Sequence, residues 1–245
     1  MTGASPAAGH QVQKWQERVT EPSLTALVLF ELIAIFVATP LTELGRWSMV
    51  ADIVLLVLVM GAGVLVVRHS RTAVITIVAA FVLSFLTAPV RAHSASPIAL
   101  YVDFAAKLAV LGVLTWVVGS AVFGPGRVTF HRIQGAIAIY LQISLIFSYI
   151  YLIIVTTVPH AFRPDIVVSG LAGDVLQVAN AGPQKGGSQL MYFSLVTLTS
   201  IGYGDIVPVY PIARSLATFE AVIGQLFPAT ILARLVTLEL EGRRR

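Results

Sequence analysis

The segment from Thr197 to Asp205 reads TLTSIGYGD and places glycines at alternate positions among potential oxygen ligands. A dehydrated cation needs oxygens in place of its hydration shell, and rows of inward-pointing backbone carbonyls provide them when several chains converge. Successive carbonyls point the same way only if backbone handedness alternates, and glycine adopts positive φ at little cost. Gly202 and Gly204 stand where positive φ is needed. The segment therefore predicts a cation site made of backbone oxygens.

The other residues of the segment fit the same chemistry. Ile201 and Tyr203 keep ordinary dihedrals and are expected to point away from the ion path into packing. Ser200 can add a hydroxyl oxygen at the inner end of the row. Asp205 is expected at the outer mouth, where its negative charge attracts cations.

These nine residues resemble the selectivity-filter motif of potassium channels, T-x-T-T-V-G-Y-G-D, with Ser200 for the last threonine and Ile201 for valine. The resemblance covers residues 133 to about 240. It implies a homotetramer with one central pore, K⁺ as the permeant ion and no cofactor. It also implies ion binding by the filter carbonyls and the Ser200 hydroxyl, with support around them. The implied ion-binding residues are Ser200, Ile201, Gly202, Tyr203 and Gly204, and the supporting and outer-mouth residues are Thr197, Thr199 and Asp205.

The composition indicates an integral membrane protein. Hydrophobic residues make up 57% of the 245-residue chain and charged residues 11%, against about 25% charged in soluble domains. The absence of cysteine excludes disulfides and thiolate metal sites. The histidines fall in loops or tails without an HExxH pattern, and no GxSxG is present, so no enzyme is expected. The net charge of +4 is dispersed in short loops and at the C-terminus, which favours membrane topology over a nucleic-acid partner.

The sequence predicts an all-α fold with six transmembrane helices, because a span needs about 20 mostly apolar residues. Residues 1–23 are expected to form a cytoplasmic tail. The expected spans are Leu24–Leu41, Met49–Val67, Thr72–Val90, Pro97–Phe123, Ile133–Val158 and Ile212–Leu240.

Loop charges predict which side the ends of these spans face, because short cytoplasmic loops accumulate lysine and arginine. One side would hold Lys14, Arg18, Arg68, Arg71, Arg127, Arg132 and Arg243 to Arg245. The other would hold only Arg46, Arg91, Arg163 and Lys185, with Arg214 as a further candidate. Both termini are therefore expected in the cytoplasm, with the plasma membrane as the expected location and its lipid as a partner.

The pore domain is expected to comprise residues 133–245. Its parts would be an outer helix (133–158), an extracellular loop (159–187), a pore helix (188–199), the filter (200–205) and an inner helix (211–240). The pore helix is too short to span, so it is expected to be re-entrant, with Ser188 as N-cap after a flexible Gly186-Gly187 approach.

The inner helix carries Gly224, twenty residues after Gly204. The resemblance implies a gating hinge there, and glycine weakens a helix interior by about 1 kcal/mol relative to alanine. Gly224, Pro228, Leu232 and Val236 share a face that is expected to line the cavity. Leu232 or Val236 is expected to narrow it at the cytoplasmic gate. The alternative is a helix-packing glycine with a static kink at the proline.

Two polar residues, Glu220 and Gln225, lie in the membrane part of the inner helix, where such residues usually face protein or water. One hypothesis places Glu220 behind the filter, hydrogen-bonded to the re-entrant helix. The other pairs it with Arg214, although their spacing does not favour a direct contact.

Residues 24–132 are expected to form a four-helix domain with the layout of a voltage sensor but without its repeated arginines. Its last span carries only Lys107, so strong voltage gating is not expected. Glu31, Asp103 and Lys107 are predicted to form a buried charge cluster that orients this domain, and a vestigial sensor is the alternative.

The sequence thus favours a passive K⁺-selective channel with weak or no voltage gating. A less selective cation channel is one alternative, because Ser200 alters the innermost site. A non-conducting scaffold or regulatory subunit is another, because conduction depends on assembly. The opening stimulus, the roles of Glu220 and of the 159–187 loop, and accessory subunits are not revealed.

Overall fold

The computed structural model describes residues 24–40, 71–93, 97–123, 130–164, 166 and 185–243, which are mostly helical. The first helix (24–40) contains the π-helical turn η1 (Ala34–Ala38). The longer elements that follow are α4 (Arg71–His93), α5 (Pro97–Phe123), α6 (Phe130–Thr157), α8 (Lys185–Leu198) and α9 (Pro211–Arg243). Two short strands, β1 (Phe162–Arg163) and β2 (Val207–Pro208), flank α8 in the sequence.

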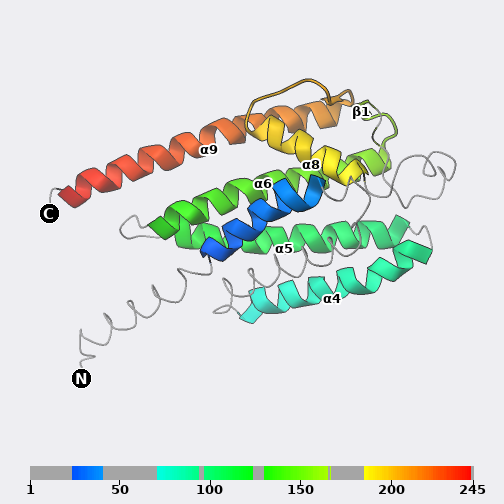
Figure 1. Cartoon of the computed structure of the whole chain (residues 1–245), viewed down its shortest axis with the longest axis horizontal. Coiled ribbons are helices and arrows are strands. Elements are labelled where there is room, and N and C mark those ends of the chain that lie inside the picture. The colour runs from blue at the N-terminus through cyan, green and yellow to red at the C-terminus, as the bar shows by residue number, and fades with distance from the viewer. Residues whose placement is uncertain are drawn as a thin grey trace.

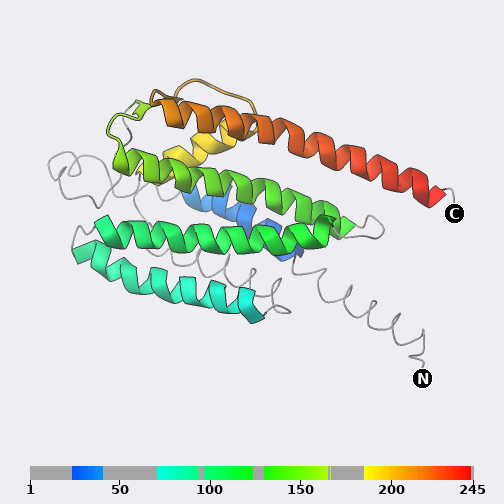
Figure 2. The ribbon, with the colours of Figure 1, turned by 180° about the vertical axis from the view of Figure 1, so that it is seen from behind.

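The long helices lie roughly side by side along the longest axis of the molecule (Figure 1). The view from behind shows α4, α5 and α6 as successive layers, with α9 along the edge beyond α6 (Figure 2). The end of α5, the start of α6 and the C-terminal end of α9 lie toward one end of this axis. The end of α6, β1 and the start of α9 lie toward the other (Figures 1 and 2). This alternation of directions is the one that successive membrane crossings require.

Three described helices are long and apolar enough to cross a membrane: Ile98–Ser120, Arg132–Thr157 and Pro211–Arg234. Shorter apolar helices occupy Leu24–Val37 and Arg71–Ala80. The helix limits agree closely with the expected spans: α5 has the predicted bounds, α6 begins slightly earlier and ends at Thr157 instead of Val158, and α9 extends its predicted span at both ends. The predicted span Met49–Val67 lies outside the described residues. The six-span topology stays a prediction.

Apolar side chains join the helices into one packed unit. Ala73, Ile77 and Ala80 of α4 pack against α5 residues that include Leu114. Leu27 of the first helix packs with residues of α5 and α6, and Phe227 and Ile231 of α9 join this cluster. The largest cluster brings together α5, α6, α8, α9 and β1, so the short helix α8 is held by long helices.

Near the end of α6 the chain is connected to the segment that precedes α9. Strands β1 and β2 pair antiparallel, with Phe162 opposite Pro208 and Arg163 opposite Val207. Beyond the strands, the Ala161 carbonyl accepts hydrogen bonds from the N–H groups of Val209 (2.9 Å) and Tyr210 (3.2 Å). The chain after the TLTSIGYGD segment is therefore fixed to the end of α6.

The structure divides the predicted charge cluster into two sites. Lys107 Nζ lies 2.9 Å from Asp103 Oδ2 and 5.7 Å from the centre of the Tyr149 ring. Glu31 instead accepts a hydrogen bond from Gln142 Nε2 at 2.7 Å. Gln142 Oε1 in turn accepts one from Thr115 Oγ1 at 2.9 Å, and that residue lies about 12 Å beyond Lys107 along α5. Asp103 and Lys107 thus pair as predicted. The prediction that Glu31 belongs to the same cluster is wrong, because its partner is Gln142.

Candidate cation-binding site

The helix that leads into the candidate site is α8, which has 14 residues and is too short to cross a membrane. It begins at Lys185 rather than at the predicted Ser188. Gly186, Gly187 and Ser188 therefore belong to its first turn, which corrects the expected flexible approach and N-cap. The helix ends at Leu198, close to the predicted end.

A hydrogen-bonded cap ends α8 at the first residue of the expected filter. The Ser200 N–H donates to the Thr197 carbonyl and the Ile201 N–H donates to the Val196 carbonyl, both at 2.9 Å. Ser200 has φ = 57°. These two bonds around a left-handed residue constitute a Schellman motif, in which glycine usually occupies the left-handed position. Ser200 therefore serves both as the cap of α8 and as the start of the filter segment.

Backbone handedness alternates along the filter segment. Gly202 has φ = 56° and Gly204 has φ = 79°, which confirms the positive φ predicted for both glycines. Ser200 extends the same alternation one step inward, with φ = 57°. A Cβ added at Gly202 or Gly204 would meet no atom within 4 Å in the single chain. Their requirement for glycine therefore comes from the backbone conformation and not from crowding.

The last four carbonyls of α8 all have hydrogen-bond donors. Those of Val196 and Thr197 are bonded within the cap, and the Leu195 carbonyl accepts from the Thr199 N–H at 3.0 Å. The Leu198 carbonyl accepts from the Tyr140 hydroxyl of α6 at 3.1 Å. Because unpaired carbonyls at a helix end are unfavourable away from water, this bonding fixes the point where the chain leaves the helix.

Glu220 of α9 is fully buried behind α8 and bridges three helices. The Tyr151 hydroxyl of α6 donates to Glu220 Oε2 at 2.7 Å. Ser194 Oγ of α8 makes a hydrogen bond with Glu220 Oε1 and lies 2.8 Å from the Ser144 carbonyl and 3.0 Å from its hydroxyl. The hypothesis that Glu220 bonds to the re-entrant helix is therefore confirmed for the contact itself, and its partner is Ser194.

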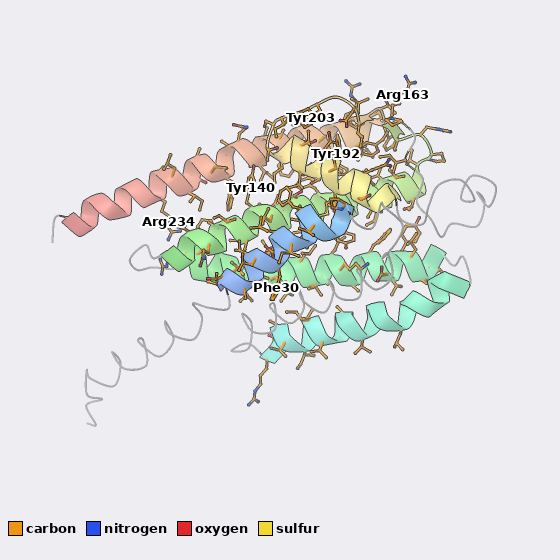
Figure 3. The ribbon with its side chains drawn as sticks, viewed as in Figure 1. Phe30, Tyr140, Arg163, Tyr192, Tyr203 and Arg234 are labelled. Atoms are coloured by element: carbon orange, nitrogen blue, oxygen red, sulfur yellow. The ribbon has the colours of Figure 1, made fainter. Side chains whose placement is uncertain are left out.

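At the other end of the filter segment two tyrosines lie face to face. The rings of Tyr192 and Tyr203 are 6.4 Å apart and stacked, with an interplanar angle of 2° (Figure 3). Tyr192 also lies near Asp205, whose Oδ1 accepts a hydrogen bond from the Ile206 N–H at 3.1 Å. Tyr203 therefore packs on α8, as expected for a side chain directed away from the ion path. Ile201 and Tyr203 are both exposed in the single chain.

Gly224 lies against the backbone of α8. A Cβ at this position would come within 1.8 Å of the Leu198 carbonyl oxygen. The close approach supports the packing role that sequence reasoning kept as the alternative to a hinge, and the hinge stays a prediction. On the rest of the predicted cavity face, Pro228 and Leu232 are exposed in the single chain, and the side chain of Val236 lies outside the described part.

The polar partners of the site were mostly missed from the sequence. Ser144, Tyr151 and Ser194 are buried polar residues within apolar segments. Such residues usually face protein in a membrane, which is a signal of burial but does not name the partner. Gln225 donates from Nε2 to Ser200 Oγ at 2.8 Å, a contact between α9 and the filter that spacing along the chain did not predict.

Arg234 marks the opposite end of α9 from this site (Figure 3). Its guanidinium donates to the Phe123 carbonyl at 2.9 Å and lies 5.3 Å from the centre of the Phe123 ring. The cation thus binds the C-terminal end of α5, where a helix carries partial negative charge.

Comparison with known proteins agrees with this geometry. Residues 166–240, which include α8, the filter segment and most of α9, match the family described as "Ion channel". The chain is therefore a membrane protein with an ion-channel domain. It is 32% identical to Protein LctB of Geobacillus stearothermophilus over 126 residues, which are 51% of this chain and 86% of that protein. The chain belongs to the same family as this protein.

Two further relatives match shorter regions. The inward rectifier potassium channel Kirbac3.1 of Paramagnetospirillum magnetotacticum is 39% identical over 54 residues, which are 22% of this chain and 17% of that protein. Protein LctB of Bacillus caldotenax is 44% identical over 46 residues, 19% of this chain and 34% of that protein. No solved structure matches the chain significantly.

Proposed function

We propose that this protein is a potassium-selective channel that conducts K⁺ passively through the central pore of a homotetramer in the cell membrane. The observation that carries the proposal is the alternation of φ at Ser200, Gly202 and Gly204, which follows a helix too short to span. This alternation turns successive carbonyls toward one side, and carbonyl rows of this kind replace the hydration shell of K⁺. Ser200, Ile201, Gly202 and Tyr203 supply the proposed carbonyl ligands.

The geometry of the segment supports an assembly of several copies. One strand of carbonyls cannot surround an ion, so several copies must converge on a common axis. Ile201, Tyr203, Phe219 and Leu226 are exposed in the single chain, and burial between neighbouring copies would remove this apolar surface from water or lipid. The similarity to an inward rectifier potassium channel supports K⁺ as the permeant ion. Both termini are proposed to be cytoplasmic, on the loop charges given above.

A flux measurement tests the proposal. We expect purified protein in liposomes with a K⁺ gradient to carry K⁺ flux that exceeds Na⁺ flux and is blocked by Ba²⁺, with empty liposomes as control. Cross-linking in the same membranes is expected to give tetramers. Equal fluxes of K⁺ and Na⁺ would favour a less selective cation channel. A confirmed tetramer without K⁺ flux would defeat the proposal and favour a scaffold or regulatory subunit.

Voltage dependence is expected to be weak. Moving one charge through the full membrane field contributes about 2.3 kcal/mol per 100 mV, and steep gating needs three to four such charges per subunit. Lys107 already has an ionic partner on its own helix, Asp103. We expect Lys107→Gln to leave the voltage dependence of single-channel open probability unchanged, and to lower the yield of folded protein. A clear displacement of the open-probability curve would instead identify Lys107 as a vestigial sensor.

A further inference from the structure

The hydroxyl of Ser200 lies at the inner end of the filter segment. Its environment differs from that of the backbone oxygens further along the segment. The positive φ at Ser200 is strained for a β-branched residue, so serine fits this backbone better than threonine does. Serine lacks the second γ group that restricts rotation about χ1. A hydroxyl at this position therefore needs a neighbour to fix its direction.

Gln225 of α9 is that neighbour. Its Nε2 donates to Ser200 Oγ at 2.8 Å, and both residues are exposed in the single chain. A hydroxyl oxygen has two lone pairs, so one remains for a cation while the other accepts the amide proton. Because the amide N–H of Gln225 points at one lone pair of the Ser200 oxygen, the hydroxyl's own proton must point in another direction.

We propose that Gln225 is a positioning residue for the innermost cation site, which it serves by holding the Ser200 hydroxyl oxygen toward the ion path. The inference rests on the proposed function, since it concerns a K⁺ site of the same filter. The ligand is a dehydrated monovalent cation, and Ser200 is the group that touches it. Gln225 acts through Ser200 and leaves the carbonyl sites above it unchanged.

The position of Gln225 makes this site sensitive to α9. It directly follows Gly224, whose backbone contacts the Leu198 carbonyl at the end of α8. Pro228 has no N–H to donate to the carbonyl of Gly224, so the helix lacks one internal bond at this level. A rotation within α9 at the level of Gly224 and Pro228 therefore moves the amide donor of Gln225 relative to Ser200. The innermost cation site is thus linked to the conformation of the inner helix.

The test is a double-mutant cycle on the full-length protein. Gln225→Met keeps the length of the side chain and removes the donor, and Gln225→Leu is made in parallel in case one variant folds poorly. Ser200→Ala removes the acceptor, with and without the Gln225 change. Thr230→Val is the matched control, because the Thr230 hydroxyl of α9 donates only to the Phe227 carbonyl of its own helix.

Two readouts are taken for each variant. One is the ratio of K⁺ to Na⁺ flux in liposomes. The other is the K⁺ concentration that gives half-maximal protection of the purified protein against heat, which does not depend on conduction. A hydrogen bond of this kind contributes about fivefold to an equilibrium. We expect Gln225→Met to raise the half-maximal K⁺ concentration about fivefold and lower the flux ratio, and to do neither when Ser200 is already alanine.

The outcomes separate the inference from the function. Wild-type protein without K⁺ flux would overturn the proposed function and this inference with it. Wild-type flux combined with unchanged readouts in both Gln225 variants would overturn the inference alone. An effect of Gln225→Met that persists in the Ser200→Ala background, or that Thr230→Val reproduces, would also overturn it, because Gln225 would then act by another route.

Discussion

Replacing Glu220 by leucine is expected to lower the unfolding temperature of the purified protein by about 5–10 °C and to abolish K⁺ flux. The carboxylate bonds to Tyr151 of α6 and to Ser194 of α8, and all three groups are buried. Leucine leaves the buried Tyr151 hydroxyl without this acceptor, at a cost of about 1–3 kcal/mol for an unsatisfied group, and it removes the link to Ser194, whose hydroxyl keeps the Ser144 carbonyl as an acceptor. Because Ser194 lies on the helix that carries the filter, the loss acts on the site itself.

The surroundings of Tyr151 increase the effect. Its ring packs edge-to-face against Phe162 of β1 (5.7 Å) and Phe193 of α8 (5.2 Å), and these two rings also contact each other. A displaced Tyr151 therefore disturbs α8 and the strand pair together. Glu220→Gln, which keeps one acceptor oxygen and the side-chain length, is expected to lose less than half as much stability.

Thr218→Val provides the matched control for Glu220. It lies on the same helix, and its exposed hydroxyl donates only to the Arg214 carbonyl one turn earlier. Heat unfolding followed by size-exclusion chromatography in detergent measures the three variants together. If Glu220→Leu unfolds at the same temperature as Thr218→Val, the buried bridge does not support the fold.

Replacing Gly224 by alanine is expected to remove K⁺ flux and to reduce the fraction of folded protein. The added Cβ would lie 1.8 Å from the Leu198 carbonyl oxygen and 2.7 Å from its carbon. These are backbone atoms at the end of α8, so they cannot rotate away as a side chain could. Overpacking of this kind typically costs about 1–3 kcal/mol and shifts the backbone. Here the shift would move the start of the filter segment.

Gly112→Ala is the matched control, because a Cβ there would meet nothing within 4 Å and Gly112 also lies inside an apolar helix. Alanine favours a helix interior by about 1 kcal/mol, so this variant is expected to be neutral or slightly stabilised. Pro228→Ala separates packing from bending, since it restores the internal hydrogen bond of α9 to the Gly224 carbonyl without adding a Cβ at Gly224. Normal flux in Gly224→Ala would show that α8 tolerates the displacement. Reduced open probability in Pro228→Ala would support the hinge.

The local features of the site could be predicted from the sequence because they depend on neighbouring residues. The lengths of α5, α6 and α9 follow from continuous apolar runs between polar segments. The positive φ of Gly202 and Gly204 follows from the conformational freedom of glycine. The positive φ of Ser200 was missed, since glycine is the usual signal for such a cap and serine is not.

For contacts between helices, the sequence could predict that a buried polar residue has a partner, but not which residue the partner is. A buried Glu220 required a partner, but spacing along α9 could not choose Ser194 and Tyr151 among the polar residues of other helices. For Glu31 the same reasoning selected the wrong partners. A charged partner was expected for its carboxylate, but the side-chain amide of Gln142 donates the hydrogen bond instead. A packing role for Gly224 was kept as the alternative to a hinge, but its contact could not be predicted, since the atom it approaches belongs to a different helix.

The pairing of β1 with β2 has a consequence for how an ion meets the filter segment. The segment Ile201–Ile206 is held at one end by the cap of α8 and at the other by the strand pair, both within a single chain. Ordering a free backbone costs about 1–2 kcal/mol per residue. Between two such anchors, most of that entropy is lost when the chain folds, before any ion arrives. A cation bound as in the proposed function would therefore meet preorganised oxygens, and its binding free energy would not be consumed in ordering them.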